Sequence, residues 1–188
     1  LAEEAIYVEQ AMCKENVGCQ DQALAAFGGF NYIEFGGSEH LHVQKVTMPW
    51  EKKRYLESHL MMFFTGFSRM ASEIAAHQIK NIPKKEKELK HMYEMVEAAV
   101  EILNGRNFIP FGKLLHESWK LKRSLSDKIT TEHIDNIYNA ARSAGAIGGK
   151  LLGAGGGGFL LGVNFQGGRV QQREQHCRRH HPEFRELR

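Results

Sequence analysis

The chain has 188 residues, of which 42% are hydrophobic and 25% are charged, a balance typical of one globular domain or the larger part of one. It has no run of about 18 apolar residues, and its first residues lack the basic and hydrophobic regions of a signal peptide, so we expect a cytoplasmic protein without a membrane span. The net charge of +3 lies in residues 166–188, which carry six arginines and three glutamates, so the remainder is neutral and nucleic acid is not an expected partner. The cysteines, Cys13, Cys19 and Cys177, show no disulfide framework and fit a reducing compartment.

The first part of the chain is predicted to form two helices followed by a β-hairpin. Apolar residues recur every three or four positions over 1–15, which indicates a helix. A short helix is expected over 22–27, with Asp21 placed to cap its free amides. Apolar and polar residues alternate over 30–35 and 41–46, which predicts two strands paired as a hairpin.

The middle of the chain changes to one buried strand and a series of helices. The apolar run 60–64 suits a buried strand. In the third of the helices Trp119 should face the core. The cations beside it, Lys120, Lys122 and Arg123, are expected to be solvated, with substrate contact as the alternative. The four predicted helices cover 69–80, 87–103, 111–122 and 132–143.

The segment 149–163 is the most informative pattern in the sequence, because it sets four consecutive glycines between two apolar runs. This pattern is typical of a tight turn between two strands. Glycines can take positive φ and let a phosphate or sugar lie against bare main chain, whose amides are natural anion donors. An ordinary glycine-rich hairpin is the alternative, because the segment is neither a Walker loop nor a dinucleotide-binding fingerprint. Together the elements predict an α+β fold, an antiparallel sheet with helices packed on one face.

The same glycine-rich segment resembles the third motif of the GHMP small-molecule kinases, a family that includes galactokinase, homoserine kinase and mevalonate kinase. Residues 17–31 are similar to the catalytic-aspartate segment of the sugar kinases in that family. Residues 63–74 and 116–123 resemble one branch, the D-glycero-D-manno-heptose 7-phosphate kinases and their fucokinase-like relatives. The resemblance runs over residues 1–163.

The resemblance implies a GHMP-kinase-like fold whose N-terminal portion is missing from this sequence. Residues 1–48 would be the remainder of the N-terminal kinase domain, and 49–165 would be the C-terminal domain with the third motif. In the family, a proline-, glycine- and serine-rich loop leading into a helix grips the nucleotide phosphates. No such loop is found in this sequence.

The end of the sequence, residues 166–188, departs from the family pattern and is expected to be a divergent, disordered basic tail. His176, Cys177, His180 and His181 could ligate zinc by residue type. Their spacing matches no closed four-ligand site, so no metal site is predicted.

The resemblance also implies an activity, the transfer of the γ-phosphate of ATP, with Mg²⁺, to a sugar hydroxyl. The implied partner is a small-molecule sugar or sugar phosphate, and the implied acceptor is the anomeric hydroxyl of a heptose 7-phosphate. Asp21 is the implied catalytic residue, because related sugar kinases place an aspartate of this segment against the reacting hydroxyl. The implied phosphate-binding loop is Gly153, Ala154, Gly155, Gly156, Gly157 and Gly158, and the implied substrate-binding residues are Gln20, Gln22, Thr65, Gly66 and Arg69.

Alternatives stay open at the level of residues and of function. Asp21 could serve only as a helix cap. Arg69 suits bidentate pairing with a sugar phosphate, but could also be a surface residue at a helix end. The chain could be a catalytically incompetent fragment that keeps a sugar-binding pocket, which the missing phosphate loop favours. Within the family, fucokinase or another sugar kinase is the competing activity.

Overall fold

The computed structural model describes residues 1–36, 41–67 and 71–164. The predicted tail at 166–188 therefore lies outside the described residues. The chain divides into two compact units, Leu1–Pro49 and a second unit that begins at Trp50. The assignment of these units to parts of two kinase domains stays a prediction.

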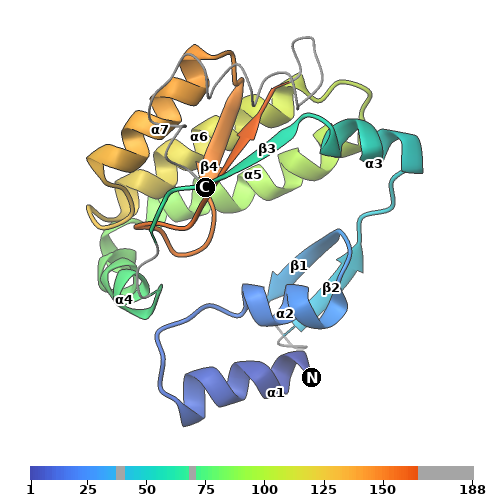
Figure 1. Ribbon diagram of the computed structural model, residues 1–188. Coiled ribbons are helices and arrows are strands. Elements are labelled where there is room, and N and C mark those ends of the chain that lie inside the picture. The colour runs from blue at the N-terminus through green and yellow to red at the C-terminus, as the bar shows by residue number, and fades with distance from the viewer. Residues whose placement is uncertain (37–40, 68–70, 165–188) are drawn as a thin grey trace. The chain divides into compact units, whose positions relative to one another are not determined.

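The first unit contains two helical segments and the predicted hairpin (Figure 1). The opening helix continues as a π-helical turn and ends at Met12, earlier than predicted; Lys14, two residues on, adopts a φ of 56°. The strands of the hairpin are antiparallel, with Ile33 opposite Val43. The elements are α1 (Ala2–Tyr7), the π-helical turn (Val8–Met12), α2 (Gln20–Phe27), β1 (Asn31–Phe35) and β2 (Leu41–Lys45).

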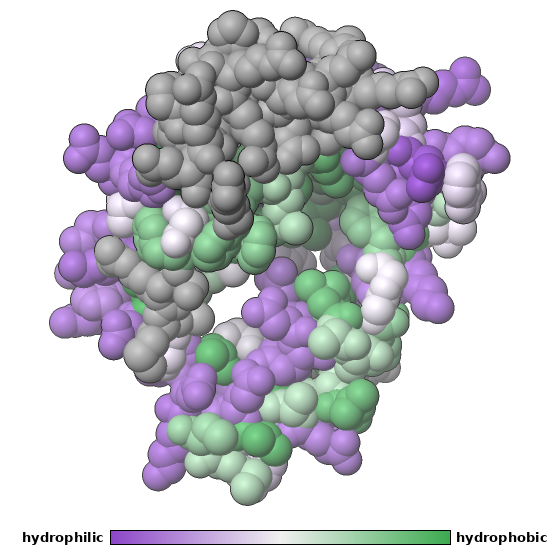
Figure 2. Space-filling view, in the orientation of Figure 1, coloured by the Kyte–Doolittle hydropathy of each residue, from purple (hydrophilic) through white to green (hydrophobic). Residues whose placement is uncertain are grey.

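Large apolar side chains lie exposed in this first unit, among hydrophilic ones (Figure 2). The buried hydrophobic cluster of the described residues contains no member from it. Ala23 of α2 is fully buried, but it is small and contributes little apolar area. The exposed apolar side chains include Tyr7, Val8, Met12, Phe27, Phe30 and Phe35.

The second unit is built on a three-stranded antiparallel sheet in the order β3-β5-β4. Its strands are β3 (Leu60–Phe64), β4 (Gly148–Leu151) and β5 (Phe159–Val163). The last two are the strands predicted on either side of the glycine turn. The central strand β5 pairs on both sides, with Leu160 opposite Phe63 in β3 and opposite Leu151 in β4.

The second unit also contains helices, four of which match the predicted ones. Sequence reasoning missed α3, because Leu56 is its only buried residue and it has no apolar stripe. None of the helices among the described residues is long and apolar enough to cross a membrane. The helices are α3 (Trp50–Glu57), α4 (Ala71–Asn81), the 3₁₀ turn Ile82–Lys84, α5 (Glu86–Asn104), α6 (Ile109–Leu125) and α7 (Glu132–Ser143).

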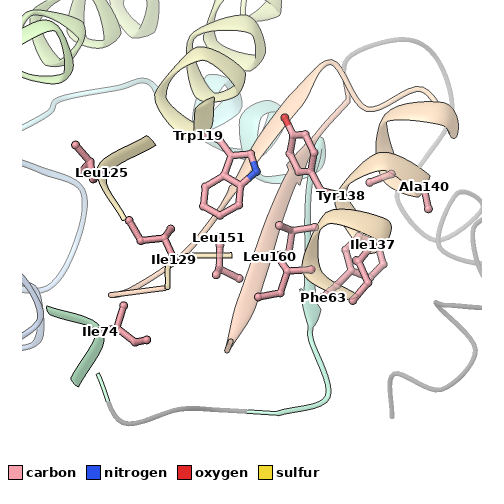
Figure 3. Packing of buried hydrophobic residues seen from close by; sticks show 12 residues of the cluster. Phe63, Ile74, Trp119, Leu125, Ile129, Ile137, Tyr138, Ala140, Leu151 and Leu160 are labelled. Carbon is pink, nitrogen blue, oxygen red and sulfur yellow. The ribbon is translucent and has the colours of Figure 1, made fainter. Parts of the chain in front are cut away.

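The core of the second unit lies between the sheet and helices α4, α6 and α7 (Figure 3). Trp119 of α6 is fully buried there, as its position in the predicted helix indicated. On the opposite side of the strands Met62 is 61% exposed and Phe159 is 45% exposed, whereas Val163, on the same side as Phe159, is fully buried. This is the expected α+β arrangement, with antiparallel strands and helices packed on a buried sheet face. Other cluster members are Phe63, Ile74, Ile129, Ile134, Ile137, Leu151 and Leu160.

Candidate active site

The glycine-rich loop between β4 and β5 is folded by hydrogen bonds to two other segments. At its base the amide of Leu152 donates to the carbonyl oxygen of Phe159 at 2.8 Å, which continues the strand pairing. The amide of Gly156 donates to the carbonyl of Ile129 at 2.8 Å, and that of Gly158 donates to the carbonyl of Phe67 at 2.9 Å. The loop is therefore fixed to the segment after α6 and to the segment after β3.

Four amides of this loop, which we call the free amides, have no hydrogen-bond acceptor among the described residues. Unpaired amides in a turn of mixed φ sign form a concave anion-binding surface. Positive φ occurs at Gly153, Gly155, Gly156 and Gly158. Gly155 and Gly157 are buried, whereas Gly153 is exposed. Buried amides normally find a partner, so the free amides at Gly155 and Gly157 point to a ligand or water. The free amides belong to Gly153, Ala154, Gly155 and Gly157.

Two of the glycines are required by packing within the chain itself. A Cβ at Gly155, where φ is +119°, would lie 3.0 Å from backbone atoms of Ile129. A Cβ at Gly157 would lie 2.9 Å from the carbonyl oxygen of Phe67. Gly153 differs, since a Cβ there would meet nothing within 4 Å and only its φ of +69° favours glycine. Glycine is thus needed at Gly155 and Gly157 for the close approach of backbone segments, and the closeness of the loop to a ligand stays a prediction.

Thr65 follows β3 and anchors the end of the glycine loop. Its side chain is fully buried. Its backbone amide and its hydroxyl both donate hydrogen bonds to the carbonyl oxygen of Gly158, at 2.8 and 2.9 Å. Its own carbonyl lies 3.1 Å from Nε2 of His133. These contacts hold the Thr65 side chain inside the protein, so its predicted contact with substrate stays a prediction. Gly66 is exposed at a φ of +87°, and Arg69 lies outside the described residues.

Sequence reasoning missed two side chains that hold the loop. Lys122, in the last turn of α6, donates to the carbonyl of Gly153. Gln78 of α4 donates through Nε2 to the carbonyl of Ala154 at 2.7 Å. Both contacts join segments far apart in the sequence, so no local pattern indicated them. The expectation of solvated cations after Trp119 is correct for Lys120, which is 57% exposed.

Arg123 and Lys150 are two further cations of the second unit. The Arg123 guanidinium pairs with Asp135 at 2.8 Å and so ties α6 to α7. Lys150 lies in β4 directly before the loop, and burial lowers the pKa of its ammonium group. No group of three His, Cys, Asp or Glu side chains among the described residues could hold a metal ion.

Asp21 lies in the first unit, at the second position of α2. It is exposed, and no ion pair or hydrogen bond to its carboxylate occurs among the described residues. The helix begins at Gln20, with no side-chain hydrogen bond at its N-cap Cys19, so the alternative role of Asp21 as a cap finds no support in these contacts. Gln20 is exposed, whereas Gln22 is buried and donates to Glu9.

The fold and the glycine loop define a class of protein that the comparisons identify. The family model for the GHMP kinases C terminal matches residues 95–183. A search of solved structures finds a Leishmania major mevalonate kinase, with R-mevalonate bound, at a TM-score of 0.68 and 19% identity, covering 88% of this chain and 49% of that one. The chain belongs to the GHMP kinases and corresponds to their C-terminal part.

Two curated relatives give the comparison more detail. D-glycero-alpha-D-manno-heptose 7-phosphate kinase from Campylobacter jejuni is 33% identical over 147 residues, which are 77% of this chain and 43% of that protein. Mevalonate kinase from Thermococcus onnurineus is 31% identical over 152 residues, which are 76% of this chain and 41% of that protein. The chain thus spans less than half the length of these relatives.

Proposed function

We propose that this chain forms part of an ATP-dependent sugar kinase that phosphorylates the anomeric hydroxyl of a heptose 7-phosphate. The observation that carries the kinase assignment is the glycine loop, whose four free amides suit the oxygens of a phosphate group. The sugar phosphate is favoured by the likeness to the heptose 7-phosphate kinase of Campylobacter jejuni. The likeness to mevalonate kinases supports the same chemistry on a different acceptor.

In the proposed reaction, the sugar oxygen forms a bond to the γ-phosphorus of ATP while the bond to the β-phosphate oxygen breaks, releasing ADP. The hydroxyl proton passes to a carboxylate or to solvent. By the resemblance to sugar kinases, the exposed carboxylate of Asp21 is the group proposed to accept or orient it. The free amides would stabilise charge on the transferred group. Mg²⁺, when bound with ATP, would neutralise phosphate charge; in kinases it is held by one or two carboxylates and by the phosphates themselves.

Exchange of Asp21 tests the catalytic part of this proposal. In the full-length protein from the native gene, Asp21→Asn is expected to lower kcat on heptose 7-phosphate by about a hundredfold or more, since a positioned acid–base group contributes about that much. The measurement is ADP release with Mg-ATP and, in parallel, heptose 7-phosphate, fucose, galactose and mevalonate. If the wild-type protein turned over mevalonate or fucose faster than heptose 7-phosphate, the heptose assignment would be contradicted.

The chain offers a matched control for that substitution. Glu51 is an exposed carboxylate at the second position of α3, which has eight residues like α2. Glu51→Gln therefore removes the same charge from the same helical position. A loss of kcat as large in Glu51→Gln as in Asp21→Asn would show a general charge effect and overturn the role of Asp21.

A second candidate function is a sugar-binding protein without kinase activity. It concerns the 188-residue chain by itself, which spans less than half the length of its curated relatives. Calorimetry of the 188-residue chain distinguishes the two. Binding of Mg-ATP at micromolar affinity would contradict the non-catalytic function, whereas sugar binding without any Mg-ATP isotherm would support it.

A further inference from the structure

Two adjacent carbonyl groups of the glycine loop are held by side chains from two different helices. The Gly153 carbonyl accepts from Lys122 of α6, and the Ala154 carbonyl accepts from Gln78 of α4 at 2.7 Å. Each donor atom lies at the end of a long side chain from a helix outside the loop. The loop needs such contacts, because glycine loses more conformational freedom on folding than any other residue.

Fixing these carbonyls also fixes the direction of two free amides. A peptide group is planar, and in its trans form the carbonyl and the next residue's amide point in opposite directions. The bond from Lys122 therefore turns the amide of Ala154 away from α6. The bond from Gln78 turns the amide of Gly155 away from α4.

We propose that Lys122 and Gln78 are positioning residues that aim the amides of Ala154 and Gly155 at a phosphate oxygen. This inference rests on the proposed function and adds to it the residues that prepare the loop before a ligand arrives. Donors that are already oriented bind an anion without the cost of ordering the loop. The rest of the loop is anchored independently, through Ile129, Phe67 and Thr65.

The two side chains make separable predictions. Lys122→Met keeps the length of the side chain but removes its donors and charge, and Gln78→Leu removes only a neutral donor. Hydrogen bonds from charged groups contribute more than neutral ones, so we expect anion affinity to fall roughly tenfold in Lys122→Met and roughly threefold in Gln78→Leu. Lys122→Arg keeps a charged donor and should restore most of the affinity.

The experiment is an NMR titration of the 188-residue chain, labelled with ¹⁵N at glycine and alanine, with inorganic pyrophosphate. The amide signals of Ala154 and Gly155 report binding at the loop itself. Lys120→Met is the matched control, because Lys120 carries the same charge on the same helix but pairs with Glu117 rather than with the loop. Thermal unfolding of each variant shows that it is folded.

The outcomes separate this inference from the proposed function. A selective loss of affinity in Lys122→Met and Gln78→Leu, with little change in Lys120→Met, supports the inference. Pyrophosphate binding at the loop that is equal in all variants would overturn the inference and leave the proposed function standing. Lack of pyrophosphate binding at the loop of the folded wild-type chain would overturn the loop's proposed phosphate role, and the inference with it.

Discussion

Single residues decide how the glycine loop fits against the second unit. At Gly155 and Gly157 the loop backbone comes so close to another backbone segment that an added Cβ would lie 3.0 and 2.9 Å from it. The fixed features are thus the close approaches to Ile129 and Phe67. The proposed anion-binding role depends on them, because a displaced loop would no longer present its amides together.

Gly155→Ala is expected to destabilise the protein by about 1–3 kcal/mol, because a side chain at a φ of +119° is strained and its Cβ would lie 3.0 Å from Ile129. Urea unfolding measures the change. Gly162→Ala is the control, since a Cβ there would lie at an ordinary 3.8 Å from the carbonyl of Met61. Equal midpoints for the two variants would contradict the close approach at Gly155.

At the scale of elements, α7 shows how a local signal and a tertiary contact combine. The helix begins after Thr131, whose hydroxyl accepts from the amide of Ile134 at 3.3 Å. Its inner face carries Ile134 and Ile137, both fully buried in the core. Asp135 on another face joins α7 to α6 through Arg123. The start of α7 could be predicted because the capping hydroxyl of Thr131 lies only three residues before the amide that donates to it.

Thr131→Ala is expected to cost about 1 kcal/mol of unfolding free energy, because one amide at the start of α7 loses its acceptor. Thr131→Ser keeps the hydroxyl and should stay within a few tenths of a kcal/mol of the wild type. Chemical denaturation of both variants tests the cap. A Ser variant as unstable as the Ala variant would assign the effect to the lost methyl group instead.

At the scale of the whole molecule, His116 makes stability depend on pH. Nδ1 of His116 and the Tyr138 hydroxyl lie 2.5 Å apart, and burial raises the pKa of Tyr138 to about 12, so the tyrosine keeps its proton at neutral pH. Burial, followed by the charge of Arg142, lowers the pKa of His116 from its ordinary value of 6.5. Glu117 acts in the opposite direction and Lys120 in the same direction.

The sign of this effect follows from proton binding in the two states. Because the pKa of His116 is lower in the folded than in the unfolded state, the unfolded state binds the proton first as pH falls. Stability from this group is present above pH 6.5 and is lost below it. We expect the urea midpoint to fall between pH 7 and about 5.5, and to fall less in His116→Gln. An equal fall in both proteins would assign the pH dependence to other histidines.

The sequence alone determined the elements whose signals are local. The alternation of apolar residues predicted β1 and β2, helical spacing predicted α5 to α7, and consecutive glycines predicted the turn between β4 and β5. It also led to the GHMP kinase family, which the comparisons confirm. Asp21 was found in the same way, by its place within a recognisable segment, and its role is still a proposal.

Only the tertiary structure decided how the glycine loop is held. Lys122 and Gln78 contact it from 31 and 76 residues away in the sequence, and nothing in a helix pattern distinguishes a cation that binds a loop from a solvated one. The helix α3 likewise could not be predicted from hydrophobic periodicity, since it buries a single residue. Periodicity records which side of an element faces the core, whereas the partner of a polar side chain depends on which segments the folded chain brings together.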